Sequence, residues 1–211
     1  MGSNSTVITM DIYPTMSSDK VYAIVLAAGT SSRLGHNPKQ LLNWNNRPLL
    51  EHALLNVQAI LQERIIVVLG AYSHAIETGI NLNAFKTVFN PDWQQGIASS
   101  IRAGIQALPD NATAALIVLS DQPLIRSEYF QCLLTTWESS PTQIVASEYH
   151  QSVGVPALFP ARFFTPLQSL QGDQGAKSLL IKFEKELITI PLPEAELDID
   201  SIEDFNDLKD H

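Results

Sequence analysis

The sequence has a single cysteine, no long apolar run and few basic residues. Cys132 has no disulfide partner within the chain, and its surroundings, YFQCLLTTW, predict a thiol on the buried face of a helix. No apolar run approaches the roughly 18 residues that a membrane-spanning helix needs, and the first residues lack a basic stretch followed by an apolar block. We therefore expect a cytoplasmic protein with no membrane partner.

The shortage of basic residues gives the chain an acidic balance, with 13 Lys and Arg against 22 Asp and Glu and a net charge of −9. Such a balance argues against a nucleic-acid partner. The acidity is concentrated in residues 194–211, which hold eight acidic residues and one lysine and are typical of a solvated surface helix. The rest of the chain, with 14 acidic and 12 basic residues, is nearly neutral, so it leaves room for a small anionic ligand.

The 211 residues are 45% hydrophobic, which fits one globular domain. Residues 1–19 have no periodicity and predict a loose tail, so we expect a single domain over residues 20–211. Short runs rich in Val and Ile predict strands at residues 21–26, 64–69, 86–90, 114–119 and 143–146. Helical spacing covers residues 50–61, 73–80, 97–108 and 127–138, with Pro48 in the first turn of one helix and Ser127 as the cap of another.

This alternation of strands and helices predicts a three-layer α/β/α sandwich around a mostly parallel, Rossmann-like sheet. Ligands of such sheets gather beyond the carboxyl ends of the strands, which directs attention to residues 28–39 and 120–123. In the second half of the chain we expect a strand and hairpin at 153–160, helices broken by Gly172 and Gly175, and a last strand at 187–192. A terminal helix capped by Ser201 would follow.

The connection LAAGTSSRLGHNPKQLL, residues 26–42, predicts a phosphate-binding loop. Gly29 and Gly35 permit close backbone approaches, and free amides at a strand end can bind an anion. Arg33 and Lys39 place two cations in the same loop, which an ordinary turn does not need. The glycine spacing fits neither the Walker nor the dinucleotide-binding pattern, so the expected ligand is a nucleoside triphosphate held in another way.

This loop resembles the signature of nucleotidyltransferases that couple a sugar, isoprenoid or pterin phosphate to a nucleoside triphosphate. Further blocks resemble the molybdenum cofactor cytidylyltransferase branch of this superfamily, within the MobA-like NTP transferases: NPDWQQGIASSIRAG from Asn90, LSDQPLI from Leu119, GVPALF from Gly154, GDQGAKSLL from Gly172 and DIDSIEDF from Asp198. The chain departs from the branch at Leu34 and Lys177, where Met and Arg are common. The resemblance implies the nucleotide-diphospho-sugar transferase type of the fold inferred above.

The resemblance also assigns site residues. It implies that Lys39 and Arg33 neutralise the triphosphate and that both act in catalysis together with Asp121. The implied nucleotide-binding residues are Leu26, Ala27, Ala28, Gly29, Thr30, Arg33, Lys39, Asn90 and Ser100. The implied acceptor-binding residues are Gln122, Pro156, Gly172, Asp173 and Lys177. Helix capping is an alternative role for Ser100 and for Asp173.

A magnesium ion is the expected cofactor, because Mg²⁺ prefers one or two carboxylates completed by phosphate oxygens and water. Asp121 follows an apolar strand and suits this role, although an aspartate in a turn is a common alternative. The resemblance implies Asp200 as a second ligand, but Asp198 would share its face in an extended segment, so the sequence leaves both open. The five histidines are scattered and HExxH is absent, so no zinc site is indicated.

The resemblance implies transfer of CMP from CTP to the terminal phosphate of molybdopterin, with release of pyrophosphate and a molybdenum hydroxylase as the client of the product. The pair Ala27 and Ala28 favours CTP, because guanylyltransferase relatives usually have two glycines there. One alternative is a cytidylyltransferase acting on 2-C-methyl-D-erythritol 4-phosphate, although the DQP sequence after Ser120 departs from that family. Two further alternatives are another NTP transferase, which would use a different nucleoside triphosphate or acceptor, and a carrier of molybdenum cofactor without catalytic activity.

Overall fold

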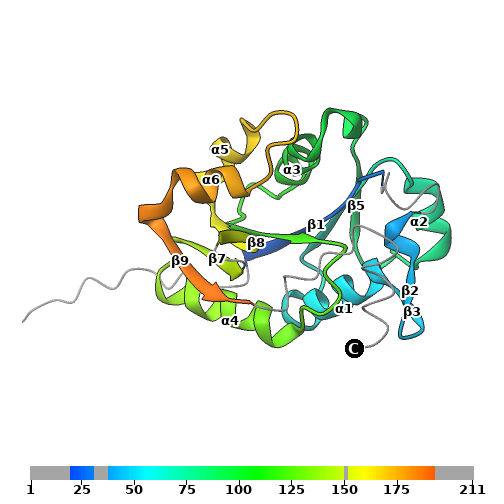
Figure 1. Cartoon of the computed structure of the whole chain (residues 1–211), viewed down its shortest axis with the longest axis horizontal. Helices are drawn as coiled ribbons and strands as arrows, with labels where there is room; N and C mark the ends of the chain where they lie inside the picture. Colours follow the sequence, from blue (N-terminus) through cyan, green and yellow to red (C-terminus); the bar gives the residue numbers. More distant parts are fainter. Residues whose placement is uncertain (1–19, 31–37, 150–151, 193–211) are drawn as a thin grey trace, which may run out of the picture.

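The computed structural model describes residues 20–30, 38–149 and 152–192, and in these ranges it contains a seven-stranded sheet with the order β5-β4-β1-β6-β8-β7-β9 (Figure 1). Its strands are β1 (Val21–Ala27), β4 (Ile65–Leu69), β5 (Lys86–Phe89), β6 (Ala114–Leu119), β7 (Ile144–Tyr149), β8 (Ser152–Pro160) and β9 (Leu187–Pro191). Strands β5, β4, β1 and β6 are parallel, β8 is antiparallel to β6 and β7, and β9 is parallel to β7. The predicted mostly parallel sheet is confirmed.

Helices cover both faces of this sheet. They are α1 (Leu49–Leu61), α2 (Ser73–Gly79), α3 (Ile97–Gln106), α4 (Ser127–Ser139), α5 (Phe164–Gln168) and α6 (Lys177–Lys182). Figure 1 shows α3, α5 and α6 on one side and α1 and α4 on the other. Strand β1 serves both layers, since Val21, Ala23 and Val25 pack with α1 and α4 while Ile24 and Leu26 pack with α3. Three layers are therefore present, as the alternation predicts.

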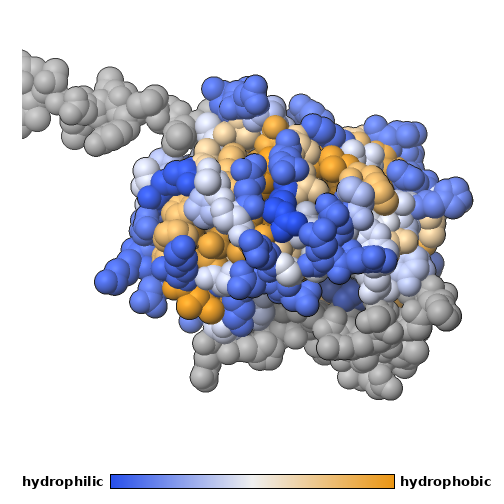
Figure 2. All heavy atoms as spheres, turned by 90° about the horizontal axis from the view of Figure 1, so that it is seen from above, coloured by the Kyte–Doolittle hydropathy of each residue, from blue (hydrophilic) through white to orange (hydrophobic). Residues whose placement is uncertain are grey.

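Short elements complete the fold. The strands β2 (Asn43–Trp44) and β3 (Arg47–Pro48) form a small antiparallel ribbon before α1. The 3-10 segments within the described ranges include Lys39–Leu41, Trp93–Gln95, Ala161–Phe163 and Glu184–Glu186. The face seen from above the view of Figure 1 is mostly hydrophilic with separate apolar patches (Figure 2). None of the helices in the three ranges is long and apolar enough to cross a bilayer.

Three local predictions are wrong. Cys132 is exposed, because the buried face of α4 is formed by Phe130, Leu133, Leu134 and Trp137, a spacing that turns position 132 outward. Ser127 is the first residue of α4, and its hydroxyl makes no capping bond to the helix backbone. Pro48 lies in β3, immediately before α1 begins. The predicted tail at 1–19 and the terminal helix after Ser201 lie outside the described residues.

The topology decides where the predicted ligand residues meet. Strands β1 and β6 are adjacent and parallel in the middle of the sheet, with Leu26 opposite Leu119. The turn after β1 begins at Ala28 and the turn after β6 begins at Ser120, so both turns leave the same edge of the sheet. Strand β4 ends there as well, at Leu69, and is followed by Gly70. This edge carries the candidate site.

Candidate functional site

Lys39 and Asp121 form an ion pair at this edge, although they are 82 positions apart in the chain. Lys39 begins the 3-10 segment Lys39–Leu41, and Asp121 lies two residues beyond the end of β6. The Lys39 ammonium donates to Asp121 Oδ2 over 2.5 Å, and the two side chains are 12% and 16% exposed. A largely buried ion pair is weak evidence for stability, because desolvating two charges offsets much of their attraction. Two of the three predicted catalytic residues therefore meet in a partly desolvated position.

The other oxygen of Asp121 is the feature that fits a cation. Asp121 Oδ1 is buried and has no hydrogen-bond partner among the described residues. A buried carboxylate oxygen without a donor is costly unless a cation or water satisfies it. The described ranges contain no group of three His, Cys, Asp or Glu residues that could hold a metal by itself. One carboxylate suits Mg²⁺, which takes most of its ligands from phosphate and water.

Three residues predicted for this site are not among those that the structure describes. Arg33 lies in residues 31–37, and Asp198 and Asp200 lie in residues 193–211, which are outside the described ranges. Their roles stay predictions from the sequence. Gly35 lies outside these ranges too.

The turn after β1 is held by bonds to its backbone carbonyls. Gln40 Nε2 donates to Ala27 O and to Gly29 O, each over 3.3 Å. The amide of Ala71 donates to Ala28 O over 3.2 Å. Three successive carbonyls are thereby fixed. The sequence pattern predicts no role for Gln40, and the only signal is its place directly after Lys39.

Neither backbone conformation nor protein packing requires glycine at position 29. Its φ is not in the left-handed region, and a Cβ placed on it would meet no atom of the described protein within 4 Å. Protein packing therefore does not require glycine here. Gly70 is the crowded glycine of this edge, because a Cβ there would lie 2.6 Å from Ala28 O. The open space beside Gly29 is compatible with close approach of a ligand.

Asn90 and Ser100 meet in a buried polar cluster at the start of α3. Asn90 Nδ2 donates to Ser99 Oγ over 2.8 Å and to Ser100 Oγ over 3.1 Å, and its Oδ1 accepts from the Asp92 amide. All three side chains of this cluster are buried. Capping does not explain Ser100, because Gly96 is the N-cap of α3 and no side chain caps the helix. The structure thus unites two predicted nucleotide-binding residues.

Gly172 and Asp173 lie against the beginning of the same helix. The amide of Ala98 donates to Gly172 O over 3.1 Å. Gly96 has φ +94°, and a Cβ there would lie 2.3 Å from Asp173 Oδ1, so only glycine fits. Asp173 is not a helix cap, because α6 is preceded by Ala176. These two predicted acceptor residues therefore border the polar cluster of Asn90.

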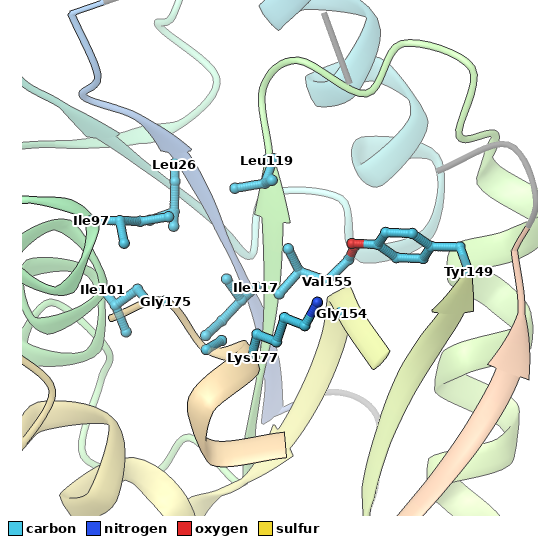
Figure 3. Close-up of a pocket in the computed structure, with 11 residues that line it drawn as sticks. Leu26, Ile97, Ile101, Ile117, Leu119, Tyr149, Gly154, Val155, Gly175 and Lys177 are labelled. Atoms are coloured by element: carbon cyan, nitrogen blue, oxygen red, sulfur yellow. The ribbon is translucent and has the colours of Figure 1, made fainter. Parts of the chain in front are cut away.

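An apolar pocket of about 160 Å³ lies between β1, β6, α3 and α6, and its lining residue Leu119 is two positions before Asp121 (Figure 3). Its lining residues are Leu26, Ile97, Ile101, Ile117, Leu119, Tyr149, Gly154, Val155, Gly175, Ala176 and Lys177. Figure 3 shows the Tyr149 hydroxyl pointing at Val155 and the Lys177 ammonium reaching toward Gly154. The hydroxyl donates to Val155 O over 3.2 Å. The pocket thus has aliphatic walls and two polar groups.

Of the other predicted site residues, some line this pocket and some do not. Leu26 and Lys177, predicted for nucleotide and acceptor respectively, line the same space. Pro156 does not line it, and its carbonyl accepts a hydrogen bond from Ser147 Oγ over 2.6 Å within the sheet. Gln122 is 2% exposed and also lies outside the lining. The lining residues Ile97, Ile101 and Tyr149 are not recognisable from the sequence, because apolar residues at helical or strand spacing are expected in any core.

Comparison with known proteins gives the family. Residues 23–187 match the model of the MobA-like NTP transferase domain. A curated relative, nicotine blue oxidoreductase of Paenarthrobacter nicotinovorans, is 37% identical over 103 residues, which are 49% of this chain and 50% of the relative. Bifunctional protein GlmU of Rubrobacter xylanophilus is 27% identical over 142 residues, 67% of this chain and 27% of that protein. The matched part of the chain thus spans half or less of the length of these relatives.

Solved structures extend the likeness over most of the chain. Rv0371c from Mycobacterium tuberculosis H37Rv has a TM-score of 0.80 and 26% identity, covering 92% of this chain and all of that one. A complex of Rv0371c with manganese has a TM-score of 0.76 and 26% identity, covering 90% of this chain and 98% of that one. With the family model matched from β1 to β9 and the predicted fold observed, the chain belongs to the MobA-like NTP transferase family of nucleotidyltransferases.

Proposed function

We propose that this protein transfers CMP from CTP to the terminal phosphate of molybdopterin. A phosphate oxygen of the acceptor attacks the α-phosphorus of CTP, a new P–O–P linkage forms, and the bond to the β-phosphate breaks as pyrophosphate leaves. The observation that carries the proposal is the pairing of Lys39 with Asp121 at the sheet edge, beside a turn with open space at Gly29. Phosphoryl transfer depends mainly on such positioning and charge neutralisation.

Lys39 and Asp121 have complementary tasks in this proposal. The pair keeps both charges compensated while the site holds no triphosphate. A triphosphate offers the Lys39 ammonium more strongly charged oxygens than a single carboxylate. Asp121, whose Oδ1 has no donor among the described residues, would hold Mg²⁺. When bound, Mg²⁺ neutralises phosphate charge, and we assign Arg33 and one of Asp198 or Asp200 to the same region from the sequence alone.

We place the base and ribose of CTP near Asn90, Ser100 and Ala28. Hydrogen bonds from Asn90 to both serines give the cluster a fixed arrangement in a buried position. A rigid polar cluster discriminates between bases better than a mobile one, because a ligand lacking a matching group leaves a buried polar atom unpaired. Gly172 and Asp173, which pack on Gly96, would close this region from the other side.

The apolar pocket supports molybdopterin over 2-C-methyl-D-erythritol 4-phosphate as the acceptor. A volume of about 160 Å³ is close to that of a cavity of about 150 Å³ that binds benzene, so it has room for about one ring of a planar group. Hydroxyl groups of a polyol would meet Leu26, Ile101 and Ile117 there and lose their hydrogen bonds with water. The Lys177 ammonium supplies a cation for an acceptor phosphate.

The test is pyrophosphate release in the presence of Mg²⁺, with CTP, GTP or ATP offered against each of the two acceptors. We expect release with CTP and molybdopterin and little with the other combinations. If pyrophosphate is released with 2-C-methyl-D-erythritol 4-phosphate and not with molybdopterin, the acceptor in this proposal is wrong. Tight molybdopterin binding without pyrophosphate from any nucleotide would identify a carrier instead of an enzyme.

A further inference from the structure

We propose that Gln40 is a positioning residue for the triphosphate, which turns the backbone amides of Ala28 and Thr30 toward the phosphates. This inference rests on the triphosphate site proposed above. Gln40 is 3% exposed, and its Nε2 donates to Ala27 O and Gly29 O. A glutamine turned the other way would face two carbonyls with its own oxygen, so these acceptors define the orientation of the amide.

Because the peptide group is planar, the two hydrogen bonds from Gln40 also fix the direction of two backbone amides. In a trans peptide the C=O of one residue and the N–H of the next point in opposite directions. Holding Ala27 O toward Gln40 therefore turns the Ala28 N–H away from Gln40, and holding Gly29 O does the same for Thr30 N–H. Two alternate amides then point to one side, where both can donate to the same anion.

A hydrogen bond from another element fixes the middle carbonyl of this turn. The Ala71 amide donates to Ala28 O over 3.2 Å, from the connection between β4 and α2. The three carbonyls are thus fixed from two different elements, so the turn is set before any ligand arrives. Gly29, with open space where a Cβ would lie, leaves room for phosphate oxygens to approach this backbone.

The two polar atoms of the Gln40 amide have opposite effects on stability. Gln40 Oε1 is buried and has no hydrogen-bond partner among the described residues, and an unsatisfied buried acceptor destabilises a fold. Met or Leu would avoid that penalty but would leave Ala27 O and Gly29 O without the donor that Gln40 supplies. The role that we assign to Gln40 therefore depends on its donors, which Met and Leu lack.

The first experiment measures binding of inorganic tripolyphosphate by calorimetry, so that it does not depend on the acceptor or on turnover. We expect Gln40→Met to bind tripolyphosphate about tenfold more weakly or worse, corresponding to about 1.4 kcal/mol. The matched control is Leu41→Val, which perturbs the same 3-10 segment through its packing on Gly79 and leaves Gln40 intact. The proposal would be overturned if Gln40→Met bound tripolyphosphate within threefold of wild type. It would also be overturned if Leu41→Val had the same Tm as Gln40→Met and lost as much affinity.

The second experiment uses the wild-type protein, so it can be carried out even if Gln40→Met does not fold. Tripolyphosphate is added to ¹⁵N-labelled protein, and the backbone amide resonances are followed. We expect the amides of Ala28 and Thr30 to shift more than those of β5 at the far edge of the sheet. Binding that leaves these two amides unmoved would contradict the proposal. If the protein binds tripolyphosphate at these amides but releases no pyrophosphate in the assay with CTP and an acceptor, the proposed reaction is wrong while the role of Gln40 is retained.

Discussion

The charged edge and the apolar pocket are neighbours with opposite chemistry. Leu119 lines the pocket, and two residues further along the chain Asp121 pairs with Lys39. On the charged side both ionic groups are largely removed from water, which strengthens their electrostatic effect on a ligand. On the apolar side the aliphatic walls select by shape and reject unpaired hydroxyl groups. Under the proposed function, the charged edge acts on the nucleotide phosphates and the apolar pocket on the acceptor, so substitutions should separate the two.

Lys39→Ala should have the largest effect. Loss of a preorganised cation facing developing phosphate charge should reduce kcat by about 10²-fold or more. The measurement is pyrophosphate release with CTP and molybdopterin. Lys86→Ala is a suitable control, because Lys86 contacts Ala107 O at the outer strand β5. A kcat of Lys39→Ala within threefold of wild type would show that the ion pair has no catalytic task.

Asp121→Asn should come next and act through the metal. The substitution keeps the shape and removes the negative charge that attracts Mg²⁺, so kcat/KM at low Mg²⁺ should fall by about tenfold to a hundredfold. Part of the loss should return as the Mg²⁺ concentration is raised. The measurement is a Mg²⁺ titration of pyrophosphate release. An unchanged Mg²⁺ requirement would remove Asp121 from the metal site.

Ala176→Phe tests the apolar region by filling it. Ala176 lines the pocket and is 4% exposed, so a larger side chain there occupies the space assigned to the acceptor. The KM for molybdopterin should rise about tenfold, equivalent to about 1.4 kcal/mol, while the KM for CTP stays the same. Ala161→Phe, at an exposed position outside the pocket, is the control. Equal increases in both KM values would mean that the two regions are not separate.

Ser100→Ala should have the smallest effect. It removes one of the two serine acceptors of Asn90 and leaves the other, a loss of about 1 kcal/mol. The KM for CTP should rise by about threefold to tenfold. Ser139→Ala, which removes an exposed hydroxyl on α4, is the control. A raised KM for molybdopterin with an unchanged KM for CTP would show that the cluster of Asn90, Ser99 and Ser100 contacts the acceptor and not the nucleotide.

The sequence predicts the strands well because fully buried strands are continuous Val- and Ile-rich runs, as in Ile65–Leu69. It predicts α4 but places Cys132 on the wrong side, because several rotations of a helix can accommodate a short apolar pattern. The resemblance implies both Lys39 and Asp121 as site residues, and the rule that ligands gather at the carboxyl ends of parallel strands directs both connections to one edge, but the sequence does not predict their ion pair.

Other site residues give no such signal. Gln40 acts on backbone carbonyls, and no pattern of side chains reveals which carbonyls will lie near it. Tyr149 belongs to β7, and only the antiparallel pairing of β7 with β8 brings its hydroxyl to Val155. Long-range pairing of this kind depends on the tertiary fold and not on local spacing.

The most direct test of the central claim is a crystal structure of the protein with CTP and Mg²⁺. We predict that the triphosphate lies at the turn of Ala27–Gly29, that the Lys39 ammonium has moved from Asp121 to phosphate oxygens, and that Mg²⁺ contacts Asp121. A triphosphate bound elsewhere, with the Lys39–Asp121 pair intact, would contradict the account.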